Sequence, residues 1–319
     1  MYRTGLAVIL SRAAYPAAGD GGLQMPVDCT LGESCYIQHL PDRDPGPETR
    51  DFLCGGLTYD GHGGTDFALP TYKAMAAGVD VLAAADGVVK GIRDEMPDQL
   101  YTPDHDAQIS GRDCGNGVLI DHEDGWQTQY CHLKLGSVAV QPGDRVTTGE
   151  ALGQIGLSGK TQFPHMHLSV RKNGTTIDPF LPSDAACGTS GADLWATTPQ
   201  VSPGGLIYAG FAPGLPEFEA IKAGTADASG LMRDVPALVL FGFTYGSQTG
   251  DILRLEITGP NGPFLEKDIV LPKPQAQLFR AAGRRLTEAN WSPGHYTGVV
   301  TMLRGEEILA RQQVTTEVR

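Results

Sequence analysis

Glycine and proline interrupt this chain too often for long helices to form. The 42 glycines and 22 prolines are about a fifth of the 319 residues, and both residue types destabilise the interior of a helix. The apolar residues show no sustained 3.6-residue period and instead alternate with polar residues over short runs. The sequence therefore predicts a mostly β protein, built from short strands and turns.

The chain divides into two parts of different composition. All six cysteines and seven of the eight histidines lie between residues 25 and 187, and the length alone predicts two domains. Small residues, Pro and Gly dominate the stretch between the two parts, as they do in a linker. We therefore expect a signal-like segment at residues 1–24, a first domain at 25–186, a linker at 187–205 and a second domain at 206–319.

Both expected domains carry strand patterns. In the first, short runs rich in β-branched residues predict a small antiparallel β-sheet or sandwich, at residues 79–83, 87–93, 117–122 and 127–132. In the second, alternating runs are separated by turn sequences such as Gly259–Gly262, and the last two runs would form a closing hairpin. This second pattern resembles an immunoglobulin-like β-sandwich, and a resemblance of pattern alone carries no function.

Charge and hydropathy exclude two kinds of partner. The chain has 24 Lys and Arg against 37 Asp and Glu, a formal net charge of −13, which would repel a phosphate backbone, so we expect no nucleic-acid partner. No stretch approaches the roughly 20 apolar residues of a transmembrane helix, so we expect no transmembrane segment. Leu6–Leu10, followed by Arg12, makes only a weak signal-peptide core.

The six cysteines predict a disulfide framework in an oxidising compartment. They are even in number and contain no CxxC pair. The alternative is a cytosolic protein with buried free thiols. Six cysteines allow 15 pairings, and the sequence leaves the choice open; the pairs that we consider are Cys29–Cys35, Cys114–Cys131 and, by elimination, Cys54–Cys187.

Three short motifs hold residue types that bind metal ions. His62-Gly-Gly-Thr-Asp66 places an imidazole and a carboxylate four residues apart, with glycines that allow a close backbone approach. His165 and His167 would share one face of a strand, and His132 ends a neighbouring strand. A single histidine is more often a structural residue, but the three motifs together predict one site.

Imidazoles with one carboxylate are a ligand set of catalytic zinc, which keeps three protein ligands and a fourth position for water. His62, Asp66 and one histidine of the His165–His167 pair would supply the three ligands. Bound Zn²⁺ lowers the pKa of water from about 15.7 to about 7 and polarises a carbonyl. The remaining imidazoles could then accept a proton or stabilise an oxyanion.

The same motifs resemble the signature segments of the lysostaphin-type (LytM-like) zinc metalloendopeptidases, which cleave peptidoglycan cross-bridges. The resemblance spans about residues 55–182, and it is carried by His62–Asp66, Tyr130–Leu133, Gly156–Gly159, Pro164–Leu168 and Asp178-Pro179. It implies a bacterial hydrolase that acts outside the cytoplasm, in the periplasm or after secretion, on peptidoglycan peptide as its substrate.

Carried over residue by residue, the resemblance assigns two roles. It implies that His62, Asp66 and His167 bind Zn²⁺. His132 and His165 would be catalytic imidazoles that do not bind the metal.

The sequence also departs from the family pattern. Cys131 stands where the family commonly has a small residue, which implies a disulfide that braces the catalytic strand. Residues 94–113 look like an insertion near the mouth of the cleft. Aromatic side chains could line a substrate groove, although they more often serve packing; the candidates are Tyr101, Trp126 and Phe163.

Two alternatives to a zinc endopeptidase remain open at this stage. One is a catalytically silent module of the same fold that binds the wall or activates a partner hydrolase, although such modules typically lose ligands. The other is a carbohydrate-directed enzyme, which needs a pair of flanking carboxylates that no motif indicates. The sequence does not reveal which cross-link is cut, whether Gln38 and His39 occlude the cleft, or whether the second domain contacts the wall or a protein partner.

Overall fold

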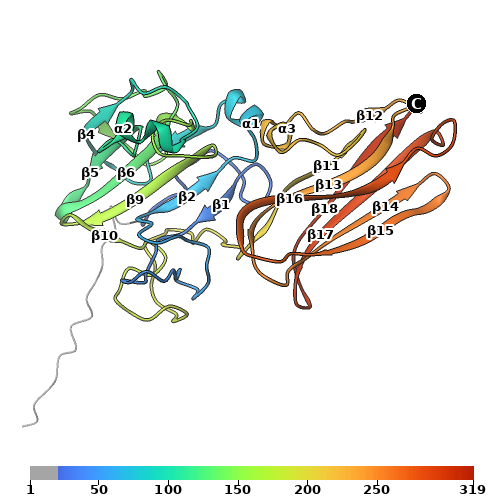
Figure 1. The fold of residues 1–319 in the computed structure, drawn as a ribbon. Helices are drawn as coiled ribbons and strands as arrows, with labels where there is room; N and C mark the ends of the chain where they lie inside the picture. The colour runs from blue at the N-terminus through green and yellow to red at the C-terminus, as the bar shows by residue number, and fades with distance from the viewer. Residues whose placement is uncertain (1–20) are drawn as a thin grey trace, which may run out of the picture.

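The computed structural model describes residues 21–319, and the fold is mostly β, as the sequence predicts (Figure 1). Residues 1–20, most of the expected signal-like segment 1–24, lie outside the described residues. Leu23 already belongs to the folded part, because it is buried and forms a β-bridge with Trp195. Among residues 21–319, no helix has the length and hydropathy needed to cross a membrane.

The N-terminal region, which we define as residues 21–204, is organised around one antiparallel sheet. The strand order is β1-β2-β9-β6-β5-β4-β7, with β10 paired to β9, and β3 and β8 form a separate pair. Its strands are β1 (Tyr36–His39), β2 (Thr65–Ala68), β3 (Asp80–Leu82), β4 (Gly87–Arg93), β5 (Asn116–Asp121), β6 (Trp126–Leu133), β7 (Arg145–Val146), β8 (Ala151–Gln154), β9 (His165–Lys172) and β10 (Thr175–Ile177). Its short helices are α1 (Tyr72–Ala77), η1 (Pro103–His105), α2 (Asp106–Ile109) and η2 (Glu123–Gly125).

The alternation of strand β9 builds the centre of this sheet. Met166, Leu168 and Val170 are buried in the hydrophobic core. His165, His167 and the other odd-numbered residues of the strand line a groove on the opposite face. This division follows from the two-residue period of a strand, so the predicted shared face of the two histidines is confirmed.

The C-terminal region, residues 205–319, consists of two sheets of longer strands. One sheet has the order β11-β13-β16 and the other β12-β18-β17-β14-β15. The elements are β11 (Gly205–Ala212), α3 (Phe218–Ala223), β12 (Gly230–Leu231), β13 (Ala237–Ser247), β14 (Ile252–Gly259), β15 (Gly262–Val270), β16 (Gln275–Arg285), β17 (Gly294–Arg304) and β18 (Glu307–Val318).

An apolar core fills the space between these two sheets. Phe211 and Leu240 from the first sheet share one core cluster with Leu255, Val300 and Met302 from the second, so the region is a β-sandwich. The last two strands pair as an antiparallel hairpin, as expected. The immunoglobulin-like resemblance of this sandwich stays a prediction.

Three disulfides join all six cysteines, all within the N-terminal region. The pairs are Cys29–Cys35, Cys54–Cys187 and Cys114–Cys131, which are the three pairs considered from the sequence. The disulfide Cys114–Cys131 links β6 to the segment that precedes β5, as the presence of a cysteine at position 131 implied.

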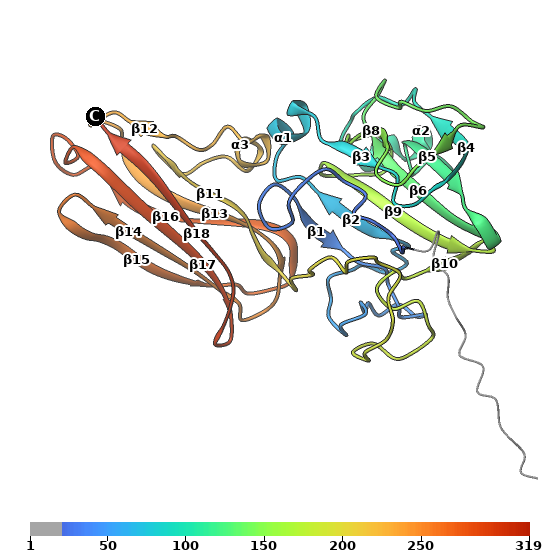
Figure 2. The same cartoon turned by 180° about the vertical axis from the view of Figure 1, so that it is seen from behind.

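The two regions pack directly against each other, and both β1 and α1 take part in the contact (Figures 1 and 2). The rings of Tyr36 and Tyr245 are 4.6 Å apart between centroids. The Nε2 of Gln277 donates to the Oη of Tyr36 and to the Oε1 of Gln38, each at 3.0 Å. Part of the expected linker is also packed, since Trp195 is buried against the N-terminal core.

Candidate metal centre and groove

Three of the predicted site residues converge at the junction of β2 and β9. Asp66 on β2 lies opposite His167 on β9 in the antiparallel register, and His62 stands in the turn that leads into β2. One potential ligand atom from each of these side chains lies within 4.8 Å of the others. The strands therefore bring together, across the sheet, the trio that the sequence assigned to the metal.

Gly64 explains why the first motif contains glycine. A Cβ atom at this position would overlap the ring of His167 and the carbonyl oxygen of Leu168. Any other residue would push the turn away from β9 and separate His62 from His167. The glycine thus permits the close backbone approach that the site needs.

Outer hydrogen bonds decide which nitrogen of each histidine faces the centre. The Nδ1 of His62 lies 2.7 Å from the carbonyl oxygen of Leu40, so this nitrogen carries the proton and Nε2 presents a lone pair inward. The Nε2 of His167 lies 3.0 Å from the Oγ of Ser169. If Nε2 donates that bond, Nδ1 of His167 also presents its lone pair inward.

The inward atoms fit a bound cation. The Nε2 of His62 and the Nδ1 of His167 are 3.1 Å apart, and they lie 3.1 Å and 2.8 Å from the Oδ1 of Asp66. Two lone pairs and a carboxylate oxygen at such distances require a proton or a metal ion between them. Two imidazoles and one carboxylate are a known ligand set of Zn²⁺, and the outer bonds to a carbonyl and a hydroxyl are typical of metal-binding histidines.

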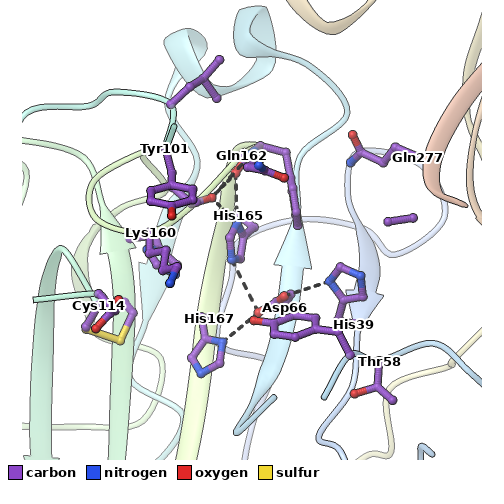
Figure 3. Close-up of a pocket in the computed structure, with 18 of the residues that line it drawn as sticks. His39, Thr58, Asp66, Tyr101, Cys114, Lys160, Gln162, His165, His167 and Gln277 are labelled. Carbon is purple, nitrogen blue, oxygen red and sulfur yellow. Dashed lines mark hydrogen bonds and ion pairs between the residues drawn. A yellow bond between two sulfur atoms is a disulfide. The ribbon is translucent and has the colours of Figure 1, made fainter. Parts of the chain in front are cut away.

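The second oxygen of Asp66 is held by His39, a residue of β1. The Nδ1 of His39 lies 3.2 Å from Oδ2, and it donates because an ionised carboxylate can only accept (Figure 3). Burial alone would raise the pKa of Asp66, but the imidazoles packed around it, those of His62, His165, His167 and His39, hold this pKa well below its usual range. The carboxyl group is therefore ionised and fixed through both oxygens.

The two remaining predicted residues lie side by side next to this cluster. The ring centroids of His132 and His165 are 4.6 Å apart. The Nδ1 of His132 donates to the carbonyl oxygen of Ser158 at 2.8 Å, and the Nδ1 of His165 donates to that of Phe163 at 2.9 Å. Each ring therefore keeps an unprotonated Nε2 as an acceptor.

Burial keeps both of these imidazoles neutral. Desolvation, with the charges of neighbouring histidines, holds the pKa of His132 well below its usual range. Desolvation also lowers the pKa of His165 to about 4, although Asp66 opposes it. His132 adopts a left-handed backbone conformation with φ of 63°, which costs free energy and is common at functional sites.

A groove of about 1210 Å³ runs past the cluster, and both regions line it (Figure 3). Tyr101 and Lys160 lie on one side and Gln277 of the C-terminal region lies on the other. The predicted insertion thus reaches the groove. Phe163 lines the groove as well, whereas the third aromatic candidate, Trp126, serves packing; its ring is buried on the other face of the sheet, near Leu23.

The sequence alone did not identify the residues that orient the imidazoles. His39 carried only an open question about occlusion, and its contact with Asp66 depends on the pairing of β1 with β2. The carbonyl groups of Leu40, Ser158 and Phe163 gave no signal, because every residue has a carbonyl. Ser158 lies within the family segment Gly156–Gly159, so the sequence indicated the segment but not the role of the Ser158 carbonyl.

Comparisons with known proteins cover this part of the chain. The family model "Peptidase family M23" matches residues 60–179, which include all five predicted site residues. The cell division protein DipM of Caulobacter vibrioides is 33% identical over 109 residues, which is 34% of this chain and 15% of that protein. The DD-carboxypeptidase/endopeptidase Mpg of Neisseria meningitidis is 32% identical over 120 residues, 37% of this chain and 22% of that protein.

The chain thus spans only about a fifth of the length of these curated relatives. Among solved structures, a zinc-containing peptidase from Vibrio cholerae is similar with a TM-score of 0.34 and 24% identity, covering 50% of this chain and 39% of that one.

Proposed function

We propose that the chain is a zinc-dependent endopeptidase that hydrolyses peptide cross-links of peptidoglycan, because residues 60–179 match the model of peptidase family M23. The observation that carries the proposal is the convergence of His62, Asp66 and His167 on one point, with their outer atoms held by hydrogen bonds. The similarity to Mpg, a DD-carboxypeptidase/endopeptidase, supports the choice of an endopeptidase.

His62, Asp66 and His167 would hold the zinc ion. Zn²⁺ bound there supplies a Lewis acid that polarises a carbonyl and lowers the pKa of water to about 7. Asp66 contributes the negative charge of the ligand set, and His39 keeps its carboxylate plane fixed. Fixed ligands favour a single coordination geometry.

His132 and His165 would act on protons and on the substrate carbonyl. Both are neutral at neutral pH, and both present Nε2 as an acceptor. We assign to one Nε2 the acceptance of the proton that the attacking water releases; the N–H formed there can then donate to the oxyanion and to the leaving amine, while the second ring lies beside it. The contacts of Nδ1 with backbone carbonyls keep both rings aimed at the groove.

A place outside the cytoplasm, periplasmic or secreted, is part of the proposal. Three disulfides persist in oxidising compartments and are rare in the cytosol. Peptidoglycan also lies outside the cytoplasm, so the proposed substrate and the disulfides indicate the same location. We keep contact of the C-terminal region with the wall or a protein partner as a further proposal.

The alternative is a catalytically silent module that binds the wall or activates a hydrolase. It is disfavoured because the complete ligand set and both neutral imidazoles are present. A decisive test incubates zinc-loaded protein with purified sacculi and measures released muropeptides by mass spectrometry, with and without a chelator. We expect cleavage that chelation abolishes.

His132→Ala separates the two functions, and His295→Ala, an exposed histidine of the C-terminal region, is the matched control. If the chain is an endopeptidase, His132→Ala should abolish cleavage of sacculi while binding to the wall persists. A folded protein that binds no zinc and leaves sacculi intact would contradict the proposed function.

A further inference from the structure

The groove floor continues along β9 beyond the metal centre. His165, His167, Ser169 and Arg171 occupy alternate positions of the strand, and all four line the groove. At about 3.3 Å of rise per residue, the Cα of Arg171 lies about 13 Å from that of His167. Arg171 therefore stands on the same floor as the metal centre, farther along the groove.

Arg171 is a cation without a partner. Within residues 21–319, its guanidinium takes part in no hydrogen bond or salt bridge of the structure, although the side chain is half-buried. Its cross-strand neighbours are Gln127 on β6 and Thr176 on β10, neither of which is acidic. Partial loss of water lowers the pKa of Arg171, but a guanidinium remains charged at neutral pH.

The other two cations of the groove differ in this respect. Lys160 lies 3.9 Å from an oxygen of Asp106, and Lys222 lies 2.6 Å from one of Glu219. A charge that is partly desolvated without compensation costs free energy. That cost is recovered when an anionic ligand supplies the missing partner.

We propose that Arg171 binds a carboxylate of the substrate peptide and thereby sets the specificity of the groove for acidic peptides. The planar guanidinium matches a carboxylate with two parallel hydrogen bonds. An extended peptide spans at most about 3.3 to 3.6 Å per residue, so the distance of about 13 Å places the carboxylate on a residue about four positions from the cleaved bond. This inference rests on the proposed function for the nature of the substrate.

The test measures binding rather than turnover. A fluorescein-labelled peptidoglycan tetrapeptide with free carboxyl groups, and the same peptide with those groups amidated, are titrated against the full chain by fluorescence anisotropy. We expect the wild type to bind the free acid about 10- to 100-fold more tightly, the range for a hydrogen-bonded charge pair. Arg171→Gln should bring the two affinities together.

Two further variants control this result. Lys172→Gln removes the neighbouring charge, which lies on the other face of β9 over the ring of Trp126, and should preserve the preference. Arg171→Lys should restore it in part, because lysine keeps the charge but lacks the planar fork. A wild type that binds neither peptide, or a preference that survives Arg171→Gln, would overturn the inference.

The outcome is distinguishable from failure of the proposed function. If sacculi stay intact while the preference for the free acid depends on Arg171, the endopeptidase proposal fails and the carboxylate site stands. If sacculi are cleaved and Arg171→Gln changes neither peptide affinity, the carboxylate site fails and the endopeptidase stands.

Discussion

The N-terminal and C-terminal regions use opposite means to reach a stable β fold. Fourteen of the nineteen buried polar residues among the described residues belong to the N-terminal region, and so do all three disulfides. The C-terminal region has strands of up to 12 residues and an apolar core between two sheets. Buried polar side chains are costly unless they are bonded, so the region that carries the chemistry also carries the cross-links.

Strand length shows the same difference. The site residues lie near strand ends and in a turn, where side chains from separate segments can converge: His62 precedes β2, His165 begins β9 and His132 is the last residue but one of β6. The long ladders of β17 and β18 instead leave no room for such convergence between their paired residues. A functional site and a regular sandwich therefore place conflicting demands on one sheet, and this chain divides them between two regions.

The largest expected effect tests whether the metal belongs to the N-terminal region alone. Asp66→Asn removes the charge of the ligand set and leaves buried imidazoles without their partner, a loss of about 3–5 kcal/mol for a broken buried pair. We expect zinc affinity to fall roughly 10²- to 10⁴-fold, measured by chelator competition. His295→Ala should change nothing, and an unchanged affinity in Asp66→Asn would remove this carboxylate from the ligand set.

A core truncation in the C-terminal region should have the converse effect. Leu255 is fully buried between the two sheets, so Leu255→Ala should lower the free energy of unfolding by about 2–5 kcal/mol. Hydrogen exchange should show the loss in β14 and β17, while zinc content stays at the wild-type value. Loss of zinc in proportion to the loss of stability would show that the regions are not energetically separate.

Removing a disulfide should weaken only the N-terminal region. Cys114→Ser with Cys131→Ser opens a link between residues 17 apart in sequence, worth about 3 kcal/mol by loop-closure entropy. Cys29→Ser with Cys35→Ser, a separation of 6, should cost about 2 kcal/mol by the same relation. Urea unfolding, with hydrogen exchange to locate the change, measures both losses of stability. An equal loss of exchange protection in β14 would show that the effect is not confined to the N-terminal region.

A smaller effect concerns the hydrogen bond between His39 and Asp66. His39→Ala should weaken zinc binding about 10- to 100-fold, as expected for a residue that only orients a ligand. His39→Gln, which retains a donor group, should restore part of this affinity. Chelator competition measures both variants; tighter zinc binding in His39→Ala would instead show that His39 obstructs the centre.

The smallest effect tests the contact between the regions. Gln277→Ala removes two hydrogen bonds to β1, each worth about 1 kcal/mol. Hydrogen exchange should increase in β1 and leave β14 unchanged. Gln312→Ala, on β18 away from the junction, is a suitable control. If the amides of β1 in Gln277→Ala were as well protected from exchange as in the wild type, Gln277 would have no role in the contact between the regions.

Local patterns predicted which side chains meet at the site, whereas tertiary contacts decided how they are held. The spacing of His165 and His167 and the glycine before Asp66 are local features, and both act in the structure as expected. The contact of His39 requires β1 to pair with β2, a relation that no local pattern contains. The choice between groove and packing for Trp126 also stayed open in the sequence, because its face of β6 depends on which side of the sheet carries the core.

The same limit applies to the boundary between the regions. The small residues around Gly191 predicted a linker, but Trp195 packs into the N-terminal core and bridges Leu23. Two adjacent apolar residues, Leu194 and Trp195, within a stretch of small and polar residues are too weak a signal to indicate this packing. Likewise, no local pattern indicates that Gln277 reaches the groove from a strand more than 100 residues after β9.

The alternation of β9 also limits how this protein can change during evolution. Substitutions at Arg171 alter only the groove, because its neighbours Val170 and Lys172 lie on the opposite face of the strand. Insertion or deletion of one residue between His165 and Arg171 would turn part of the strand over, so that apolar side chains would face the groove and polar ones the core. Descendants of this sequence can therefore acquire new substrates by substitution in β9, but this strand must keep its length.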